Sequence, residues 1–209
     1  MQTFNLRNYH IAVAVTFVIA VIIFLLSYFI GKSQFFLLLN GNGGRVADVF
    51  FAVLTYGGDG IMWIPVSLVI LIILKRKDLL PLLISVIALS TFFSHLFKDF
   101  LIPNEPRPMR AITDGSYIHT VPGVQIDYLS SFPSGHTTTV FCFYLLFCLL
   151  IKKNWWSMAG LVFALLVAYS RVYLAEHFPF DTAGGMIAAI ISMVLSVKIQ
   201  HWGWRRKTK

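Results

Sequence analysis

Charged residues are scarce in this chain of 209 residues: lysine, arginine, aspartate and glutamate together make up 12% of it, against roughly a quarter in an ordinary soluble domain. Hydrophobic residues make up 57%, and the mean hydropathy is +0.76. A soluble protein needs more polar surface than this, whereas a disordered chain would hold far less apolar and aromatic material. The composition therefore predicts a polytopic membrane protein.

Cysteine is also rare, and acidic residues are fewer than basic ones. Cys142 and Cys148 lie in one apolar run, where a helix would point them to nearly opposite faces, so no disulfide is expected between them. The formal net charge is +8, but the 17 basic residues sit in short clusters between apolar runs. This arrangement indicates membrane topology, and no nucleic-acid partner is expected.

Long uncharged runs predict the architecture. Residues 11–30 contain no charge and, at 1.5 Å per residue, are long enough to cross a hydrocarbon core of about 30 Å. Similar apolar runs follow at 57–74, 79–97, 134–151, 155–174 and 180–199. The predicted fold is all-α, with residues 1–209 forming one membrane-embedded domain: a polytopic helix bundle of six transmembrane helices plus a short interfacial helix.

The short helix is expected at 46–56. This stretch is apolar but too short to cross a bilayer, and Gly57-Gly58-Asp59-Gly60 separates it from the next run, so an interfacial or re-entrant helix is predicted. The first run is too long for the apolar part of a signal peptide, and no small-residue cleavage site precedes Lys32. The mature chain is therefore expected to keep its N-terminus.

Basic residues predict the orientation, since six crossings place both termini on one side. That side collects eleven cations: Arg7, Lys75, Arg76, Lys77, Lys152, Lys153, Lys198, Arg205, Arg206, Lys207 and Lys209. The other side holds Lys32, Arg45, Lys98, Arg107, Arg110 and Arg171. The termini are therefore predicted to be cytoplasmic, in a bacterial inner membrane. The long loop 99–132 is predicted to be extracytoplasmic, as a lid or a substrate-binding edge.

Polar residues gather at the span ends on that extracytoplasmic side. Pro133-Ser134-Gly135-His136 opens the fourth span, with Ser134 as the N-cap and Gly135 allowing close approach to the backbone. Free amides at a helix start favour an anion, and His136 can supply a proton or a hydrogen bond. Capping alone is the plainer interpretation of this tetrapeptide.

His177 and Asp181 are four residues apart at the start of the sixth span, so both can lie on one helix face. A carboxylate bonded to one ring nitrogen fixes the tautomer and leaves the other nitrogen as a nucleophile or base. A purely structural pair at the interface is the alternative. Lys98, Arg107 and Arg171 lie on the same side, which indicates a multiply charged anion, and phosphate is the natural candidate.

Residue types alone would also allow a metal site on His136, His177 and Asp181. The surrounding positive charges argue against it, and no His-Glu-x-x-His arrangement or thiolate cluster accompanies these residues. We therefore expect no metal and no other cofactor. His95 and Asp59 lie near the same side, and we leave both out of the expected site because packing or a supporting role explains them equally well.

Over residues 98–181 the sequence resembles the type 2 phosphatidic acid phosphatase family of membrane lipid phosphatases, to which vanadium haloperoxidases are related. The family signature has three parts: Lys-x6-Arg-Pro, Pro-Ser-Gly-His and Ser-Arg-x5-His-x3-Asp. The second part is found in full at 133–136 and the third at 170–181. The first departs from the pattern, because eight residues instead of six separate Lys98 from Arg107; a two-residue bulge in the intervening loop would absorb the difference.

The resemblance implies roles for these residues. His177 would attack phosphorus to form a phosphohistidine, Asp181 would orient it, and His136 would protonate the leaving oxygen and later activate water. The phosphate would be held by Lys98, Arg107, Ser134, Gly135 and Arg171. The family needs no metal, which agrees with the positive charge already present.

The resemblance also implies that the substrate is a lipid phosphate entering from the bilayer: undecaprenyl diphosphate, phosphatidic acid, phosphatidylglycerophosphate or a lipid A phosphate. Two other functions stay open. A non-catalytic lipid-phosphate binder or transporter would use the same cations, although charges at one interface are not typical of a transport path. A vanadate-dependent haloperoxidase would share the motifs, but the apolar spans disfavour it. No oligomeric state is predicted.

Overall fold

The computed structural model describes residues 4–151 and 154–207, and every regular element in those residues is helical. The α-helices are α1 (Leu6–Ile30), α2 (Lys32–Leu39), α3 (Gly44–Leu54), α4 (Trp63–Leu68), α5 (Leu80–His95), α6 (Pro108–Ala111), α7 (Gly135–Leu150), α8 (Asn154–Tyr173) and α9 (Pro179–Lys207). Short 3₁₀ turns occur at Thr55–Gly58, Gly60–Met62, Lys77–Leu79 and Gly115–Tyr117, and π-helical turns at Val69–Ile73 and Leu96–Leu101. The predicted all-helical class is confirmed.

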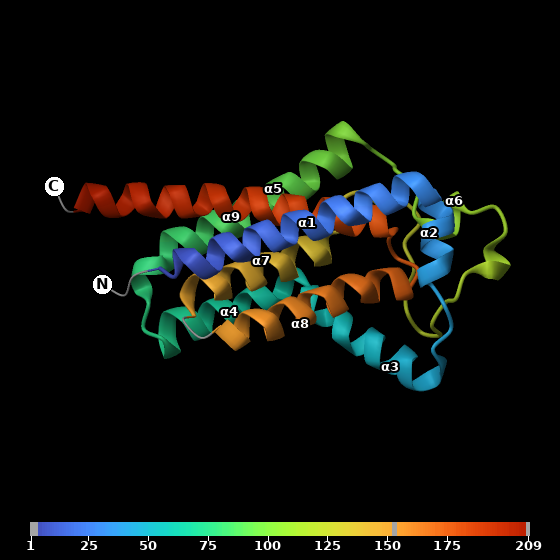
Figure 1. Ribbon diagram of the computed structural model, residues 1–209, viewed down its shortest axis with the longest axis horizontal. Coiled ribbons are helices and arrows are strands. Elements are labelled where there is room, and N and C mark those ends of the chain that lie inside the picture. The colour runs from blue at the N-terminus through green and yellow to red at the C-terminus, as the bar shows by residue number, and fades with distance from the viewer. Residues whose placement is uncertain (1–3, 152–153, 208–209) are drawn as a thin grey trace.

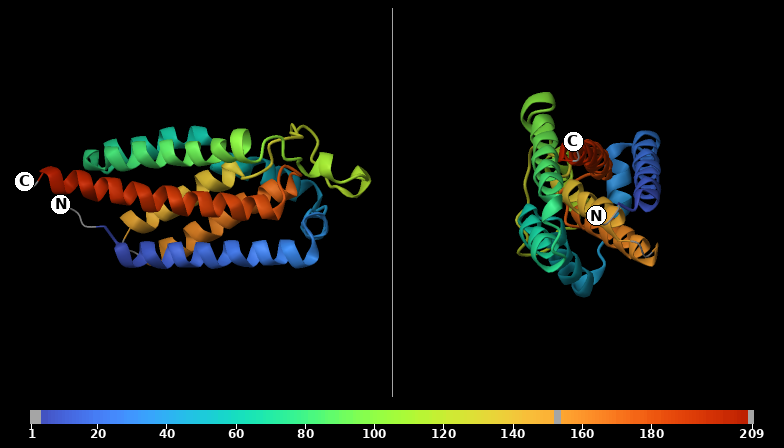
Figure 2. Two further views of the ribbon diagram at one scale, coloured as in Figure 1. Left: turned by 90° about the horizontal axis from the view of Figure 1, so that it is seen from above. Right: turned by 90° about the vertical axis from the view of Figure 1, so that its left-hand side faces the viewer.

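The long helices lie side by side along one axis (Figures 1 and 2). α1 begins and α9 ends at the same end of this bundle (Figure 1). α2, α6 and the connection from α6 to α7 lie at the opposite end. Of the cations used to predict the orientation, Lys152, Lys153 and Lys209 lie outside the described residues.

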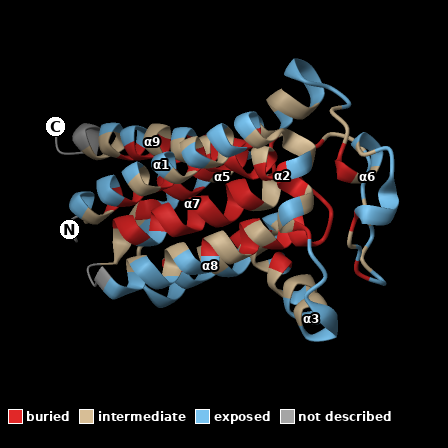
Figure 3. Ribbon diagram, turned by 45° about the vertical axis from the view of Figure 1, so that its right-hand side comes forward, coloured by how far each residue is buried: buried red, intermediate tan, exposed pale blue. Residues whose placement is uncertain are grey.

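α7 is the central helix of the bundle. It packs against α1, α5, α8 and α9, and it is buried along most of its length (Figure 3). Cys142 and Cys148 are free, buried thiols within it, as the sequence predicts. The outer helices instead present large apolar side chains to the surroundings, for example Phe17 and Ile22 of α1. An apolar exterior around a packed centre is typical of a helix bundle in lipid.

Within the residues that the structure describes, four helices are long and apolar enough to cross a membrane: Leu6–Ile30, Lys77–Leu101, Trp155–Tyr173 and Pro179–Trp204. Gly44–Gly58 and Gly60–Ile73 meet at an angle of 56° and would add a fifth crossing if they form one broken span. With 16 residues, α7 is about 24 Å long at 1.5 Å per residue, which is shorter than a hydrocarbon core. Its neighbours enclose it, so its ends need not reach lipid. The count of six crossings and the interfacial position of 46–56 stay predictions.

Candidate active site

Ser134 determines where α7 begins. Its Oγ accepts a hydrogen bond from the main-chain N–H of Thr137 at 3.4 Å, so it is the N-cap that the sequence predicts. Its own N–H donates to the main-chain oxygen of Asp181 at 3.0 Å, which joins the start of α7 to the start of α9. A Cβ added at Gly135 would meet no atom within 4 Å. The first turn of α7 is therefore open to a ligand.

The connection from α8 to α9 folds back on the end of α8. The main-chain oxygen of Arg171 accepts hydrogen bonds from the N–H groups of Glu176 at 2.9 Å and His177 at 3.1 Å. The hydrogen bond from Glu176 to Arg171 spans six residues and is typical of a helix that ends in a residue with left-handed backbone conformation. That residue is Ala175, with φ of 59°. Arg171 and His177 consequently lie next to each other although they are six positions apart.

His177 and Asp181 face each other, as their spacing predicts. His177 Nδ1 lies 3.6 Å from Asp181 Oδ2, and both side chains are almost completely buried. This oxygen already accepts hydrogen bonds from Ser131 Oγ at 2.5 Å and from the N–H of Phe178 at 2.9 Å. The distance to Nδ1 exceeds a normal hydrogen bond, but such bonds are often long before substrate binds. The carboxylate is thus held rigidly beside the imidazole.

Lys32, at the start of α2, supports the same carboxylate from its other side. Its Nζ lies 3.7 Å from Asp181 Oδ1, 2.7 Å from Glu105 Oε1 and 4.5 Å from the centre of the Phe178 ring. The sequence shows Lys32 only as one of the extracytoplasmic cations, because no motif or short spacing links it to Asp181. Only the fold brings these two residues together.

Two arginines meet at Glu176, the residue before His177. Arg107 and Arg171 are both buried, and both contact its carboxylate: Nη1 of Arg107 donates a hydrogen bond to Oε2, and Nη2 of Arg171 lies 3.4 Å from the same oxygen. Arg107 is also held by the main-chain oxygen of Leu129 at 2.8 Å, and Arg171 by Thr55 Oγ1 at 2.6 Å. The two predicted phosphate-binding arginines therefore converge on one point.

Burial shifts the ionisation of the two residues in this turn. It lowers the pKa of His177 well below the ordinary value of a histidine, and the positive charges of Arg107 and Arg171 lower it further. Burial also raises the pKa of Glu176, while the same two arginines oppose that rise. His177 is therefore a neutral imidazole at neutral pH, with a lone pair on one ring nitrogen.

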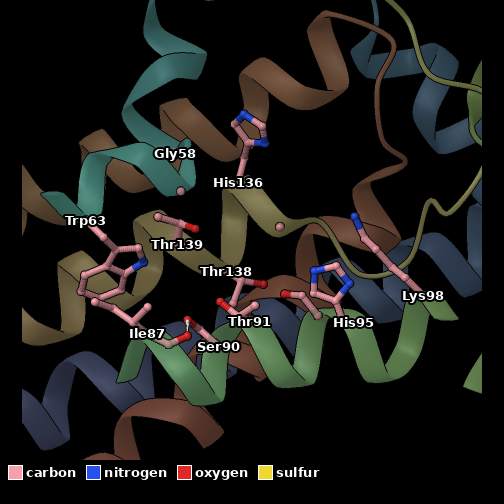
Figure 4. A pocket seen from close by; sticks show the side chains of 13 residues that line it. Gly58, Trp63, Ile87, Ser90, Thr91, His95, Lys98, His136, Thr138 and Thr139 are labelled. Carbon is pink, nitrogen blue, oxygen red and sulfur yellow. Dashed lines mark hydrogen bonds between the residues drawn. The ribbon is translucent and has the colours of Figure 1, made fainter. Parts of the chain in front are cut away.

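Lys98 and His136 border a cavity of about 320 Å³ between α5 and α7 (Figure 4). Gly135 also lines this cavity, and the hydroxyls of Thr91 and Thr138 line its interior. His136 borders a second cavity as well, of about 800 Å³.

The second cavity lies beside the turn between α8 and α9. Arg171, Glu176, Asp59 and Asp127 line it together with His136. His136 is therefore the predicted site residue that connects the Lys98 side of the site with the arginine side.

The predicted residues thus fall into three adjoining groups: Arg107 with Arg171, His177 with Asp181, and Lys98 with Gly135 and His136. Ser134 links the last two groups through the main chain.

The chain between Lys98 and Arg107 holds the two residues by which the first motif departs from the family pattern. It completes a π-helical turn and then a tight turn with Asn104 at φ of 60°. A π turn takes in one residue more than an α turn.

The two residues left out of the expected site lie at its margins. His95 borders the smaller cavity, and its Nδ1 is 3.0 Å from the exposed Asp99. Asp59 borders the larger cavity, and its side chain accepts a hydrogen bond from the N–H of Ile61 at 3.0 Å. Glu176 and Lys32, by contrast, are central to the arrangement and carry no motif that would have marked them.

Several known proteins are similar to this chain in sequence. A family model described as the PAP2 superfamily matches residues 79–205. The undecaprenyl-diphosphatase of Sulfolobus acidocaldarius is 27% identical over 170 residues, which cover 81% of this chain and 79% of that protein. The lipid A 4'-phosphatase of Bacteroides thetaiotaomicron is 29% identical over 164 residues, which cover 74% of this chain and 70% of that protein.

A solved structure shares the fold as well. The crystal structure of Aquifex aeolicus LpxE superimposes with a TM-score of 0.66 and 30% sequence identity, over 78% of this chain and 92% of that one. The matched family region contains Lys98, the start of α7 and the turn between α8 and α9. The three groups of predicted residues therefore all lie in the part of the chain that defines the family.

Proposed function

The chain belongs to the PAP2 superfamily, and from that premise we propose that it is an integral membrane phosphatase that hydrolyses a lipid phosphate. The observation that carries the proposal is the convergence of two buried guanidinium groups beside a buried histidine–aspartate pair. Buried positive charge is costly unless an anion neutralises it. A guanidinium group can donate two parallel hydrogen bonds to two oxygens of one phosphoryl group. A phosphoryl group bound there would lie next to His177.

His177 is the proposed nucleophile. Its Nδ1 faces Asp181, so a proton on Nδ1 is stabilised there and Nε2 carries the lone pair. Nε2 attacks phosphorus and forms a P–N bond as the P–O bond to the lipid breaks, and His136 gives its proton to the departing oxygen. His136 then takes a proton from water, whose oxygen attacks phosphorus while the P–N bond breaks. Inorganic phosphate leaves, and both histidines return to their starting forms.

The phosphoryl oxygens are proposed to be held by Lys98, Arg107 and Arg171 together with the first turn of α7 at Ser134 and Gly135. Three cations around a transferring phosphoryl group stabilise its negative charge as a divalent ion would. We therefore propose that the reaction needs no metal, and we expect turnover to persist in the presence of a chelator.

The substrate class follows from the relatives and the site. Undecaprenyl diphosphate and lipid A phosphates are proposed first, because two relatives are named for acting on them. Phosphatidic acid and phosphatidylglycerophosphate are the further candidates. The site lies at the bundle end opposite the start of α1 and the end of α9 (Figure 1). We propose that residues 1–209 form one domain that crosses a bacterial inner membrane six times, with both termini in the cytoplasm. The site would then face the extracytoplasmic side.

Phosphate release from a panel of lipid phosphates in mixed micelles, with and without chelator, tests the proposal. His177→Ala should abolish release, whereas His10→Ala, an exposed histidine of α1, should leave it unchanged. Quenching with alkaline detergent during turnover, which preserves a P–N bond, should trap phosphate on the wild-type protein and none on His177→Ala. Undiminished release by His177→Ala would refute the nucleophile. Tight lipid-phosphate binding without turnover would support a binder or transporter, and bromide oxidation with added vanadate a haloperoxidase.

A further inference from the structure

Glu176 stands where the arginines would meet a phosphoryl group. Its carboxylate contacts both Arg107 and Arg171, and the residue is 3% exposed. A carboxylate offers a guanidinium the same paired oxygen acceptors that a phosphoryl group offers. Glu176 also lines the larger cavity with Arg171 and His136, so it borders the space through which an anion can enter.

The arginines have other groups to hold them in place. Arg107 donates from Nε to the main-chain oxygen of Leu129 at 2.8 Å and from Nη1 to the main-chain oxygen of Glu176 at 3.2 Å. Arg171 donates from Nη1 to Thr55 Oγ1 at 2.6 Å. Its Nε is buried and has no hydrogen-bond partner among the described residues, so a donor is available to a ligand. Alignment of the guanidinium groups therefore does not require the Glu176 carboxylate.

We propose that the carboxylate of Glu176 occupies the phosphoryl position in the free protein, and that an incoming phosphoryl group displaces it from Arg107 and Arg171. This inference rests on the proposed function, because it takes these two arginines as phosphate-binding groups. Glu176, together with Asp127 3.4 Å from Arg107 Nη2, then neutralises the buried arginines while no substrate is bound. It competes with every anion that enters.

Competition of this kind affects specificity and product release. A terminal phosphate with two negative charges can replace a carboxylate with one, whereas a phosphodiester carries a single charge and gains little by the exchange. The site therefore favours terminal phosphates over phosphodiesters. The returning carboxylate also helps to expel inorganic phosphate after hydrolysis.

Glu176→Gln tests the inference, since it keeps the size of the side chain and removes its charge. Titration calorimetry of inorganic phosphate with the purified variant in detergent should give a Kd about tenfold lower than that of the wild type, because a charge-assisted hydrogen bond no longer competes. Asp114→Asn removes a negative charge from an exposed turn, where the Asp114 carboxylate accepts hydrogen bonds from Ser116, and should leave the Kd within about twofold. An unchanged or higher Kd for Glu176→Gln would overturn the inference.

A second measurement uses the wild-type chain and does not depend on the variant folding. The chain has two glutamates, Glu105 and Glu176, so ¹³C-labelled glutamate separates their carboxylate stretches from those of the aspartates. Infrared difference spectra should show the labelled band shift when inorganic phosphate is added, and Glu105→Gln should retain that shift. A labelled band that stays in place at saturating phosphate would refute the displacement.

These two measurements need no turnover, so the two proposals can fail separately. Phosphate binding with a shifted glutamate band, but no release from any lipid phosphate, would refute the proposed enzyme and support the displacement. Release of phosphate from lipids with an immobile glutamate band would support the enzyme and refute the displacement.

Discussion

Lys32→Met should destabilise the protein by leaving Asp181 without its counter-ion. Lys32 Nζ lies 3.7 Å from Asp181 Oδ1, an oxygen that accepts no hydrogen bond from any residue the structure describes. Asp181 is fully buried, whereas the Lys32 side chain is 30% exposed. Breaking a buried ion pair costs about 3–5 kcal/mol and losing an exposed one about 0.2–1 kcal/mol. This pair is intermediate, so we expect the free energy of unfolding to fall by about 1–3 kcal/mol.

A double-mutant cycle isolates this pair from the other contacts of Lys32. The free energy of unfolding in detergent is measured for the wild type, Lys32→Met, Asp181→Asn and the double variant. With Asp181 neutralised, Lys32→Met should cost less than about 0.5 kcal/mol, because no buried carboxylate is left unpaired. Lys77→Met, an exposed lysine near the other end of the bundle, should leave the unfolding free energy unchanged.

An equal cost of Lys32→Met in both backgrounds would refute the reasoning, since it would assign the loss to Glu105 or to the Phe178 ring. Lipid phosphate release provides a second readout. The kcat of Lys32→Met should fall by about tenfold, equivalent to about 1.4 kcal/mol in the barrier, because the carboxylate that orients His177 loses its contact on the Oδ1 side.

Three further predictions concern the same region. Ser131→Ala removes the 2.5 Å hydrogen bond to Asp181 Oδ2 and should lower the unfolding free energy by about 1.5–3 kcal/mol; no loss would contradict the role of that bond. Since the pKa of His177 is lowered, its imidazole stays neutral until the pH falls well below 6.5. The acid limb of kcat/KM should lie below that pH, and a limb at or above it would contradict the assignment. In α9, Gly185→Ala places a Cβ 2.6 Å from a main-chain oxygen at the start of α7 and should cost about 1–3 kcal/mol. Gly203→Ala meets nothing within 4 Å and should instead gain up to about 1 kcal/mol, so equal effects would refute the packing argument.

The helices were predictable because apolar runs must be helical in lipid, where every backbone group needs an internal partner. The residues at which the helices begin and end were less predictable. α1 begins at Leu6, before the apolar run at 11–30, because helical hydrogen bonds continue through polar residues at its start. The run at 57–74 is joined through a 56° bend to the helix before it. At the bend, a Cβ on Gly58 would lie 2.7 Å from the main-chain oxygen of His136, a close approach that no local pattern predicts.

The site residues also divide into those that short spacings in the sequence predicted and those that they did not. The N-cap at Ser134 and the facing pair of His177 and Asp181 depend on short spacings along a helix, and both are present. Lys32 and Glu176 depend on contacts between distant segments, and the sequence pattern marks neither. The roles of the predicted site residues in the reaction stay predictions until the variants are measured.

The sequence by itself determined the all-helical class, the membrane character and the short motifs, because composition and spacings of three to six residues act through local geometry. The tertiary structure alone decided that Arg107 and Arg171 share one carboxylate and that Lys32 pairs with Asp181. Those contacts join residues up to 149 positions apart, and their existence depends on how α7 organises the helices around it. Only in the folded chain do the buried positive charges need an anion beside them, and Glu176 contacts both arginines while Asp127 contacts Arg107 as well.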